Sequence, residues 1–447
     1  MVDQDVDLLL SYLDSFPELE KGFKRSPPEL FWRDRWRAVV GVRKLSLGLE
    51  IRCAGGGTLH LVPNSSVAYA RGEHHHQLLS LIETCLGPAR RRKVLAKTDR
   101  NRHQTAAILR VLLHSGGESV AVLGVYEDES PELSGRILSS LVLWWDGLKE
   151  VDFAAVFLPD NWSERILDWL PYLTVPVVCF KYCLRGRKVR RIYPRSDRFS
   201  SIQSPYVIYP MVSKAPRIFW QLNKEFPSLD VLFRRGKWEL SFRGLPVAWS
   251  DDSGSLLFDL QCPRRLLKLS SLHEHIRKVV EYRRFPPPFA DHFSFRFGEE
   301  RWLESLVMRE HRKISREFAQ QIYSQVPTWV GGDRKILDLL TVTNRGRLAV
   351  MELKTKKDLN LIFQGLDYWE RVEHHRSQCD FGDAGYFAGI DLAEVRPLLY
   401  LVSPLFEFHR SLKIIRRYLR KDCLTIRCVG INADWKRGLR ILRQFKL

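Results

Sequence analysis

The sequence predicts an α/β protein whose C-terminal third forms a mixed β-sheet flanked by helices. Three observations lead to this fold class. Of the 447 residues, 45% are hydrophobic and 28% are charged, so the chain can bury enough apolar surface to fold along its whole length. Helical and strand-like apolar spacings alternate after residue 299. Three consecutive prolines, Pro286 to Pro288, interrupt the chain just before that region.

A chain of this length is expected to divide into several domains, because a single core stops growing at about 250 to 300 residues. The segments 36–63 and 236–262 are rich in strand-forming residues, which indicates two small β modules. We therefore expect an N-terminal helix and β-rich module in 1–70, an α/β domain in 71–195, a β-rich middle module with the Pro-rich linker in 196–290, and a last domain in 291–447.

The last domain is predicted to begin with one long amphipathic helix. From Glu299 onward, apolar residues recur close to the helical period at Leu303, Leu306, Val307, Ile314 and Phe318.

A β-hairpin is expected next, in residues 335–354. Two apolar runs are separated there by Asn344-Arg345-Gly346, and a three-residue loop with glycine last closes a hairpin at little conformational cost. The segments that follow predict a helix, a buried strand, a basic helix and a final strand, at 359–375, 396–404, 406–421 and 423–431.

The hairpin register brings two acidic residues together. If the chain turns at Asn344 to Gly346, Asp338 lies opposite Glu352, and such pairs destabilise a sheet unless a cation neutralises them. Lys354 points to the same side as Glu352, whereas Leu353 points into the opposite layer. Oxygen ligands on adjacent strands are what Mg²⁺ requires.

This segment resembles the PD-(D/E)XK phosphodiesterase superfamily over roughly residues 296–447. Asp338 and Glu352-Leu353-Lys354 match its acidic residue and its Glu-x-Lys motif. Glu304 in the preceding helix agrees with the pattern, as do Gln364 and Tyr368, which match the Gln-x-x-x-Tyr of the RecB-like branch. The residue before Asp338 is leucine and not proline, which departs from the pattern.

The resemblance implies a restriction-endonuclease-like fold and a Mg²⁺-dependent nuclease, with Mn²⁺ as a substitute metal. Asp338, Glu352 and the backbone carbonyl of Leu353 would bind the metal, and Glu304 would bind it directly or through water. Lys354 and Gln364 would act in catalysis, while Tyr368 would contact nucleic acid or only pack in the core. The expected reaction is hydrolysis of DNA, by an endonuclease of repair, restriction or defence.

Charge independently favours a polyanionic partner. The net charge is +19 and the pI about 9.7, and the basic residues form short clusters spread along the chain. Charge alone separates neither nucleic acid from anionic membrane nor binding from cutting. Candidate nucleic-acid contacts are Arg234, Arg235, Arg416 and Arg417.

Other interpretations stay open at this point. The protein could be a nucleic-acid-binding scaffold that does not cleave, or an RNase. Glu300 lies one turn from Glu304 and could take its place, and Glu352 with Lys354 could form a mere surface ion pair. Because no helix-turn-helix, zinc finger or Walker loop is present, a protein partner could supply targeting.

The cysteine pattern and the N-terminus bear on location. The eight cysteines include no CxxC pair, which argues against a zinc framework and a disulfide scaffold. No signal peptide or membrane-spanning apolar stretch is evident. We expect a cytoplasmic protein with reduced thiols.

An earlier part of the chain repeats the pattern of the last domain. Residues 109–145 can be laid on 337–373 with the glycine turn preserved, which places Arg110 on Asp338 and Arg136 on Gln364. Gly124 and Tyr126 then fall on Glu352 and Lys354. This predicts a degenerate, inactive copy of the nuclease fold in 71–195, although unrelated α/β segments can also share such a pattern.

Overall fold

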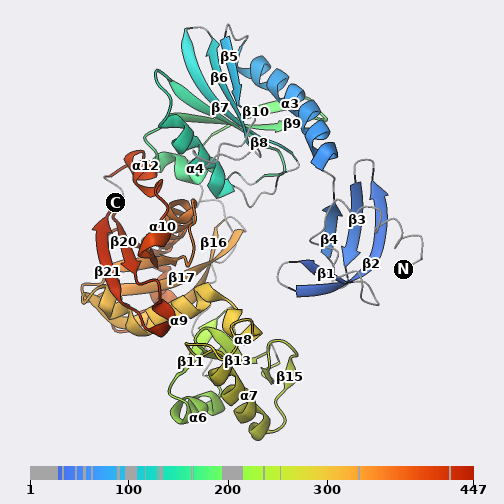
Figure 1. Cartoon of the computed structure of the whole chain (residues 1–447). Coiled ribbons are helices and arrows are strands. Elements are labelled where there is room, and N and C mark those ends of the chain that lie inside the picture. Colours follow the sequence, from blue (N-terminus) through green and yellow to red (C-terminus); the bar gives the residue numbers. More distant parts are fainter. Residues whose placement is uncertain are drawn as a thin grey trace.

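A computed structural model describes the chain at residues 29–32, 35–45, 48–53, 57–61, 64–87, 91–95, 108–115, 117–127, 129, 134–162, 164, 166–193, 215–234, 237–251, 253–330, 333–421 and 424–447. In these ranges the chain is an α/β protein with mixed and antiparallel sheets (Figure 1). Among the helices so described, none combines the length and apolar character needed to cross a membrane.

The last part of the chain forms the C-terminal sheet, a mixed sheet with strand order β16-β17-β18-β19-β20-β21. The pairs β18–β19 and β19–β20 are parallel, and the others are antiparallel. Its elements are α9 (Glu299–Ile314), β16 (Phe318–Val330), β17 (Asp333–Thr343), β18 (Leu348–Leu353), α10 (Leu361–Ser377), α11 (Asp380–Asp383), β19 (Leu398–Pro404), η4 (Leu405–Glu407), α12 (Leu412–Arg417), β20 (Ile426–Ile431), η5 (Trp435–Arg437) and β21 (Ile441–Lys446).

Helices cover both faces of this sheet. Alternate residues of its strands point to opposite faces, so Met351 and Tyr400 join the apolar cluster beside α9, whereas Val350 and Leu401 join the cluster beside α10. The predicted mixed sheet with flanking helices is therefore present.

Two strands were missed by the sequence prediction, and two helices are shorter than expected. The basic helix predicted over 406–421 is reduced to η4 and the short α12. The helix from Glu299 ends at Ile314, and Phe318 starts β16 instead of continuing the helix. Phe318 is buried, so its apolar character fitted either element. Neither β16 nor β21 was expected. Both lie at edges of the sheet, where β16 can accommodate Pro327.

The predicted hairpin register is confirmed. Leu339 pairs with Met351 and Val342 with Leu348, and the turn closes with bonds from Thr343 N–H to Arg347 O and from Gly346 N–H to Thr343 O. Gly346 has a φ of 76°, the left-handed conformation expected of a glycine in this loop. One further step along the ladder sets Asp338 opposite Glu352.

A second mixed sheet, the N-terminal mixed sheet, has strand order β10-β9-β8-β7-β6-β5. Its pairs β7–β8 and β8–β9 are parallel and the rest antiparallel, so strand order and directions match those of the C-terminal sheet. Its elements are α3 (Asn64–Leu86), β5 (Arg91–Leu95), β6 (Ile108–Ser115), β7 (Glu118–Val125), α4 (Ser134–Trp145), β8 (Phe153–Pro159), α5 (Ile166–Trp169), η3 (Leu170–Tyr172), β9 (Val177–Cys183) and β10 (Lys188–Ile192).

Equivalent rows of residues cross the two sheets. In the C-terminal sheet, the row that starts at Asp338 continues through Glu352, Leu401 and Cys428. In the N-terminal mixed sheet, the corresponding row consists of Arg110, Leu123, Val156 and Cys179. Each row contains a buried cysteine next to the edge strand.

The register thus places Leu123, and not Gly124, at the position of Glu352. Arg110 pairs with Leu123 because the turn between β6 and β7 is shorter than the turn between β17 and β18. The alignment of unbroken segments on the sequence could not include this difference in loop length. Arg110 remains the counterpart of Asp338.

The two mixed sheets pack together through their helices, α4 and α5 against α10 and α12 (Figure 1). Buried residues from both halves, including Leu141 and Leu366, form one continuous core. Leu173, before β9, forms an antiparallel bridge with Leu419, before β20. The bridge therefore joins segments that hold the same place in the two sheets.

The remaining elements form antiparallel sheets. The first contains β1 (Glu29–Trp32), β2 (Arg35–Leu45), β3 (Gly48–Cys53) and β4 (Gly57–Leu61). The second, the middle sheet, contains β11 (Leu229–Arg234), β12 (Lys237–Phe242), β13 (Leu245–Ser250), β14 (Leu256–Phe258) and β15 (Arg264–Arg265), with helices α6 (Arg217–Glu225), α7 (Leu269–Tyr282) and α8 (Phe293–Arg296). Asp230 of β11 accepts hydrogen bonds from Ser305 and Arg309 of α9, which anchors the middle sheet to the C-terminal domain.

Candidate active site

The hairpin brings Asp338, Glu352 and Lys354 together at the end of β18. Lys354 Nζ lies 3.2 Å from Glu352 Oε1 and 3.5 Å from Glu300 Oε2. The Glu352 side chain is 2% exposed and that of Lys354 is 14% exposed, so the pair is buried and is not a surface ion pair. Leu353 points into the opposite apolar cluster, as expected.

Burial raises the pKa values of both acids, and repulsion from neighbouring carboxylates adds to the rise for Asp338. The pKa of Asp338 is well above its ordinary value because the group is buried and faces the negative charges of Glu352 and Glu304. Burial raises the pKa of Glu352 to about 7, although the neighbouring Lys354 opposes this shift. The two carboxyls therefore resist being ionised together at neutral pH.

Lys354 is held as a cation. Burial by itself lowers the pKa of its ammonium, but the carboxylates of Glu352, Glu300 and Asp338 more than offset this and raise the pKa above the ordinary value. The site therefore keeps one fixed positive charge beside two carboxyls that compete for protons.

One carboxylate oxygen of the pair receives no hydrogen bond within the described part of the chain. Glu352 Oε2 is buried and has no such partner. Asp338 Oδ2, in contrast, accepts a bond of 2.9 Å from the backbone N–H of Leu353. A buried carboxylate oxygen without a donor is costly, and a cation is the partner that would satisfy it.

Glu304 lies beside the pair but is bound to other residues. Its carboxylate accepts hydrogen bonds from Ser324 Oγ and, at 2.8 Å, from Gln325 Nε2. Register places Gln325 opposite Asp338, and Gln325 has an unusual φ of 54°. Sequence analysis missed Ser324 and Gln325 because it did not predict β16.

Gln364 and Tyr368 project from α10 on the face towards the acids. The Oε1 atom of Gln364 is buried and receives no hydrogen bond from the residues that the structure describes. The pKa of Tyr368 is raised by burial and then by the charges of Glu352 and Asp338, which places its ring near the pair. Tyr368 also packs against the shared core.

Among the candidate basic residues, Arg416 and Arg417 have partners within the protein. Arg417 forms an ion pair of 2.8 Å with Asp146 at the end of α4, and Arg416 donates to the carbonyl of Leu419. Arg235 and the side chain of Arg234 lie outside the described residues. Their role as nucleic-acid contacts stays a prediction.

A divalent ion fits the chemistry of the acid pair. Two oxygen donors of raised pKa would ionise together only beside a cation, and the unsatisfied Glu352 Oε2 offers a ligand. Among the described residues, however, no group of three or more His, Cys, Asp or Glu side chains has the arrangement of a metal site. The protein would therefore supply two carboxylates, with other ligands from backbone, water or substrate.

An open pocket of about 650 Å³ adjoins these residues. It is lined from the C-terminal domain by Glu300, Lys354, Lys356, Lys357, Asp358, Leu359, Gln364 and His409, and from α4 by Arg136 and Ser140. Solvent and a substrate can therefore reach the buried Lys354 from this side.

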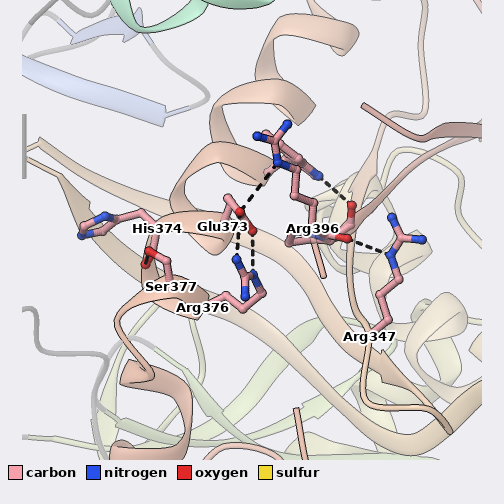
Figure 2. A network of polar contacts seen from close by, with 8 residues as sticks. Arg347, Glu373, His374, Arg376, Ser377 and Arg396 are labelled. Carbon is pink, nitrogen blue, oxygen red and sulfur yellow. Dashed lines mark hydrogen bonds and ion pairs between the residues drawn. The ribbon is translucent and has the colours of Figure 1, made fainter. Parts of the chain in front are cut away.

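A polar network fixes the other end of α10 to the hairpin (Figure 2). Glu373 accepts two bonds from Arg376 and lies 4.0 Å from Arg396, whose carbonyl accepts a bond from Arg347 in the turn. The hairpin that carries the acids and the helix that carries Gln364 are thus linked at a distance from the site.

Comparison with protein-family models and with curated proteins gives no match to this chain.

Proposed function

We propose that the protein is a Mg²⁺-dependent nuclease that hydrolyses phosphodiester bonds, with its active site at Asp338, Glu352 and Lys354. One observation carries the proposal: two directly opposed carboxyls of raised pKa lie beside a charged lysine, and the buried one, Glu352, has a carboxylate oxygen left without a donor. Such an arrangement costs stability unless it binds a cation. The net charge of +19 supplies attraction for a polyanionic substrate.

Each residue has a defined task in this proposal. Asp338 and Glu352 hold the metal, aided by the Leu353 carbonyl and by Glu304 through water. The metal supplies an activated water and stabilises charge on the phosphate. Lys354 stays protonated and neutralises charge that develops on the phosphate oxygens. Gln364 orients the substrate backbone or the lysine, and Mn²⁺ can replace Mg²⁺.

We assign residues 291–447 to a PD-(D/E)XK nuclease domain of restriction-endonuclease-like fold. We assign 71–195 to a degenerate copy of it, and the matching strand orders, strand directions and rows of paired residues support this assignment. With Arg110 and Leu123 in place of Asp338 and Glu352, the copy has lost both carboxylates, so it would be inactive.

DNA is the proposed substrate and endonucleolytic cleavage the proposed mode, in repair, restriction or defence. This preference rests on the sequence resemblance alone. A protein partner would supply targeting, and the protein would act in the cytoplasm.

Cleavage assays would test the proposal. Supercoiled plasmid and single-stranded DNA should be cut in Mg²⁺ or Mn²⁺ and remain intact in EDTA. Asp338→Ala and Lys354→Ala should each lower the rate by at least about 100-fold, because each removes a charge that acts in the transition state. Lys313→Ala, which alters an exposed lysine paired with Glu310 on α9, is the control and should keep full activity.

Two results would contradict the proposal. Full activity in both site variants would exclude these residues from catalysis. A folded parent protein that binds DNA but cuts neither DNA nor RNA with any divalent metal would favour a scaffold that does not cleave.

A further inference from the structure

The pocket beside Lys354 contains side chains from both halves of the molecule. Arg136 and Ser140 come from α4 of the N-terminal mixed sheet, and the other lining residues come from the C-terminal domain. Arg136 is exposed, lies in the first turn of α4, and has no ion pair among the residues that the structure describes. Gln364, in the first turn of α10, also lines the pocket.

Hydrogen bonds fix α4 at the entrance to this pocket. Ser139 Oγ lies 3.2 Å from the carbonyl of Leu359 and 3.3 Å from Asn360 Oδ1, immediately before α10. At the far end of α4, Asp146 accepts bonds from Arg417 and from Tyr418 Oη. Arg136 is therefore presented to the pocket by a helix that is held at its middle and at its C-terminal end.

The lining favours an anion. Arg136, Lys354, Lys356 and Lys357 provide positive charge, and the Lys356 side chain is 84% exposed. The two acids of the lining already have partners. Glu300 pairs with Lys354, and Asp358 accepts a bond of 2.7 Å from the backbone N–H of Asn360. An anionic group that enters the pocket would thus meet Arg136 and the two exposed lysines.

The size of the pocket and Gln364 indicate which anion would bind. About 650 Å³ is large enough for a nucleotide unit and far larger than a metal ion needs. The buried Oε1 of Gln364 lacks a donor in the described structure, and a nucleotide or its bound water would supply one. The geometry points to a phosphodiester strand and not to an isolated inorganic ion.

We propose that the non-catalytic half completes the substrate site of the catalytic half: Arg136 of α4, with Lys356 and Lys357, binds a backbone phosphate next to the scissile one. This inference rests on the proposed nuclease function. Arg136 touches the strand but not the reacting atoms, so it is a positioning residue. The copy retains a function in substrate binding, which explains why it stays packed against the catalytic domain.

Binding measured without metal would test this independently of cleavage. Fluorescence anisotropy of labelled single-stranded and duplex oligonucleotides in EDTA should show about three- to tenfold weaker binding for Arg136→Ala, and weaker still for Arg136→Glu. The slope of log K against log salt should fall by about one for the alanine variant. Arg185→Ala, at an exposed arginine of the β9–β10 turn outside this pocket, should bind like the parent.

Kinetics would separate positioning from a structural role. In Mg²⁺, Arg136→Ala should raise KM by the same factor while kcat changes less than about twofold, as expected for a group that binds ground state and transition state equally. Parent-like affinity and salt slope in Arg136→Ala and Arg136→Glu would overturn the inference even if the parent cleaves DNA. If the parent cleaves nothing while Arg136→Ala still loses affinity, the nuclease proposal fails and the phosphate site stands.

Discussion

Glu352 occupies a position that would favour an apolar residue if stability alone mattered. The counterpart of Glu352 in the N-terminal mixed sheet is Leu123, which packs in the shared core. Like charges opposite each other on a sheet repel, and burial adds a desolvation cost to each. The C-terminal sheet thus carries a buried acid where the N-terminal mixed sheet has a leucine.

Removal of one charge should therefore stabilise the metal-free protein. In Asp338→Asn the amide oxygen can still accept the bond from Leu353 N–H, while the repulsion of Glu352 disappears. We expect the free energy of unfolding in EDTA near neutral pH to rise by about 1 kcal/mol. Urea denaturation would measure this, with Asp383→Asn, at an exposed acid of α11, as control. A loss of stability in Asp338→Asn would contradict the account of the acid pair.

The same acids predict how stability depends on pH. The folded-state pKa of Glu352 is about 7, above its ordinary value of 4.5, so the native state binds more protons than the unfolded state between these values. Stability without metal should therefore fall as pH rises through this window. Mg²⁺ binds the ionised form, so the increase in Tm that it causes should be larger near pH 8 than near pH 5. An increase that is equal at both pH values, or larger near pH 5, would contradict this.

At the scale of elements, the hairpin turn decides where the acids lie. A Cβ atom on Gly346 would come within 2.0 Å of the Asp391 carbonyl oxygen, and the residue also has a positive φ. Gly346→Ala should therefore lower the free energy of unfolding by about 2 to 4 kcal/mol. This is more than the loss of about 1 to 2 kcal/mol expected when alanine adopts the left-handed conformation without a clash.

The N-terminal mixed sheet provides a matched control. Gly117 lies in the corresponding β6–β7 turn with a φ of 89°, but a Cβ atom there would meet nothing within 4 Å. Gly117→Ala should lower the free energy of unfolding by only about 1 to 2 kcal/mol. Thermal unfolding of both variants would compare them, and equal losses would exclude the close approach to Asp391 as the cause.

Features set by residues close together in the sequence could be predicted, whereas features set by contacts between distant segments could not. The hairpin register depends on a local glycine turn, so spacing alone placed Asp338 opposite Glu352. Edge strand β16 contains Pro327, which argues against a strand, and the Gly331-Gly332 pair after it was not used as a turn signal, so Ser324 and Gln325 beside Glu304 were not predicted. Arg136 joins the pocket only through packing of the two halves, which spacing along the chain does not encode.

At the scale of the whole molecule, the two mixed sheets depend on each other. Helices α4 and α5 cover apolar residues of α10 and α12, among them Leu366 and Ile415. Residues 291–447 produced alone should therefore expose an apolar face and either aggregate or unfold at a lower temperature than the full chain. Calorimetry of both proteins would measure this. A fragment as stable and monodisperse as the full chain would contradict the shared core.

Anomalous scattering from crystals of the full chain grown with Mn²⁺ would test the central claim most directly. We expect a manganese peak between the carboxylates of Asp338 and Glu352 that is lost in Asp338→Ala. We expect no peak at Arg110 of the N-terminal mixed sheet. With Mn²⁺ at saturating concentration, an ordered acid pair without a peak would contradict the proposal that these residues form a metal-dependent active site.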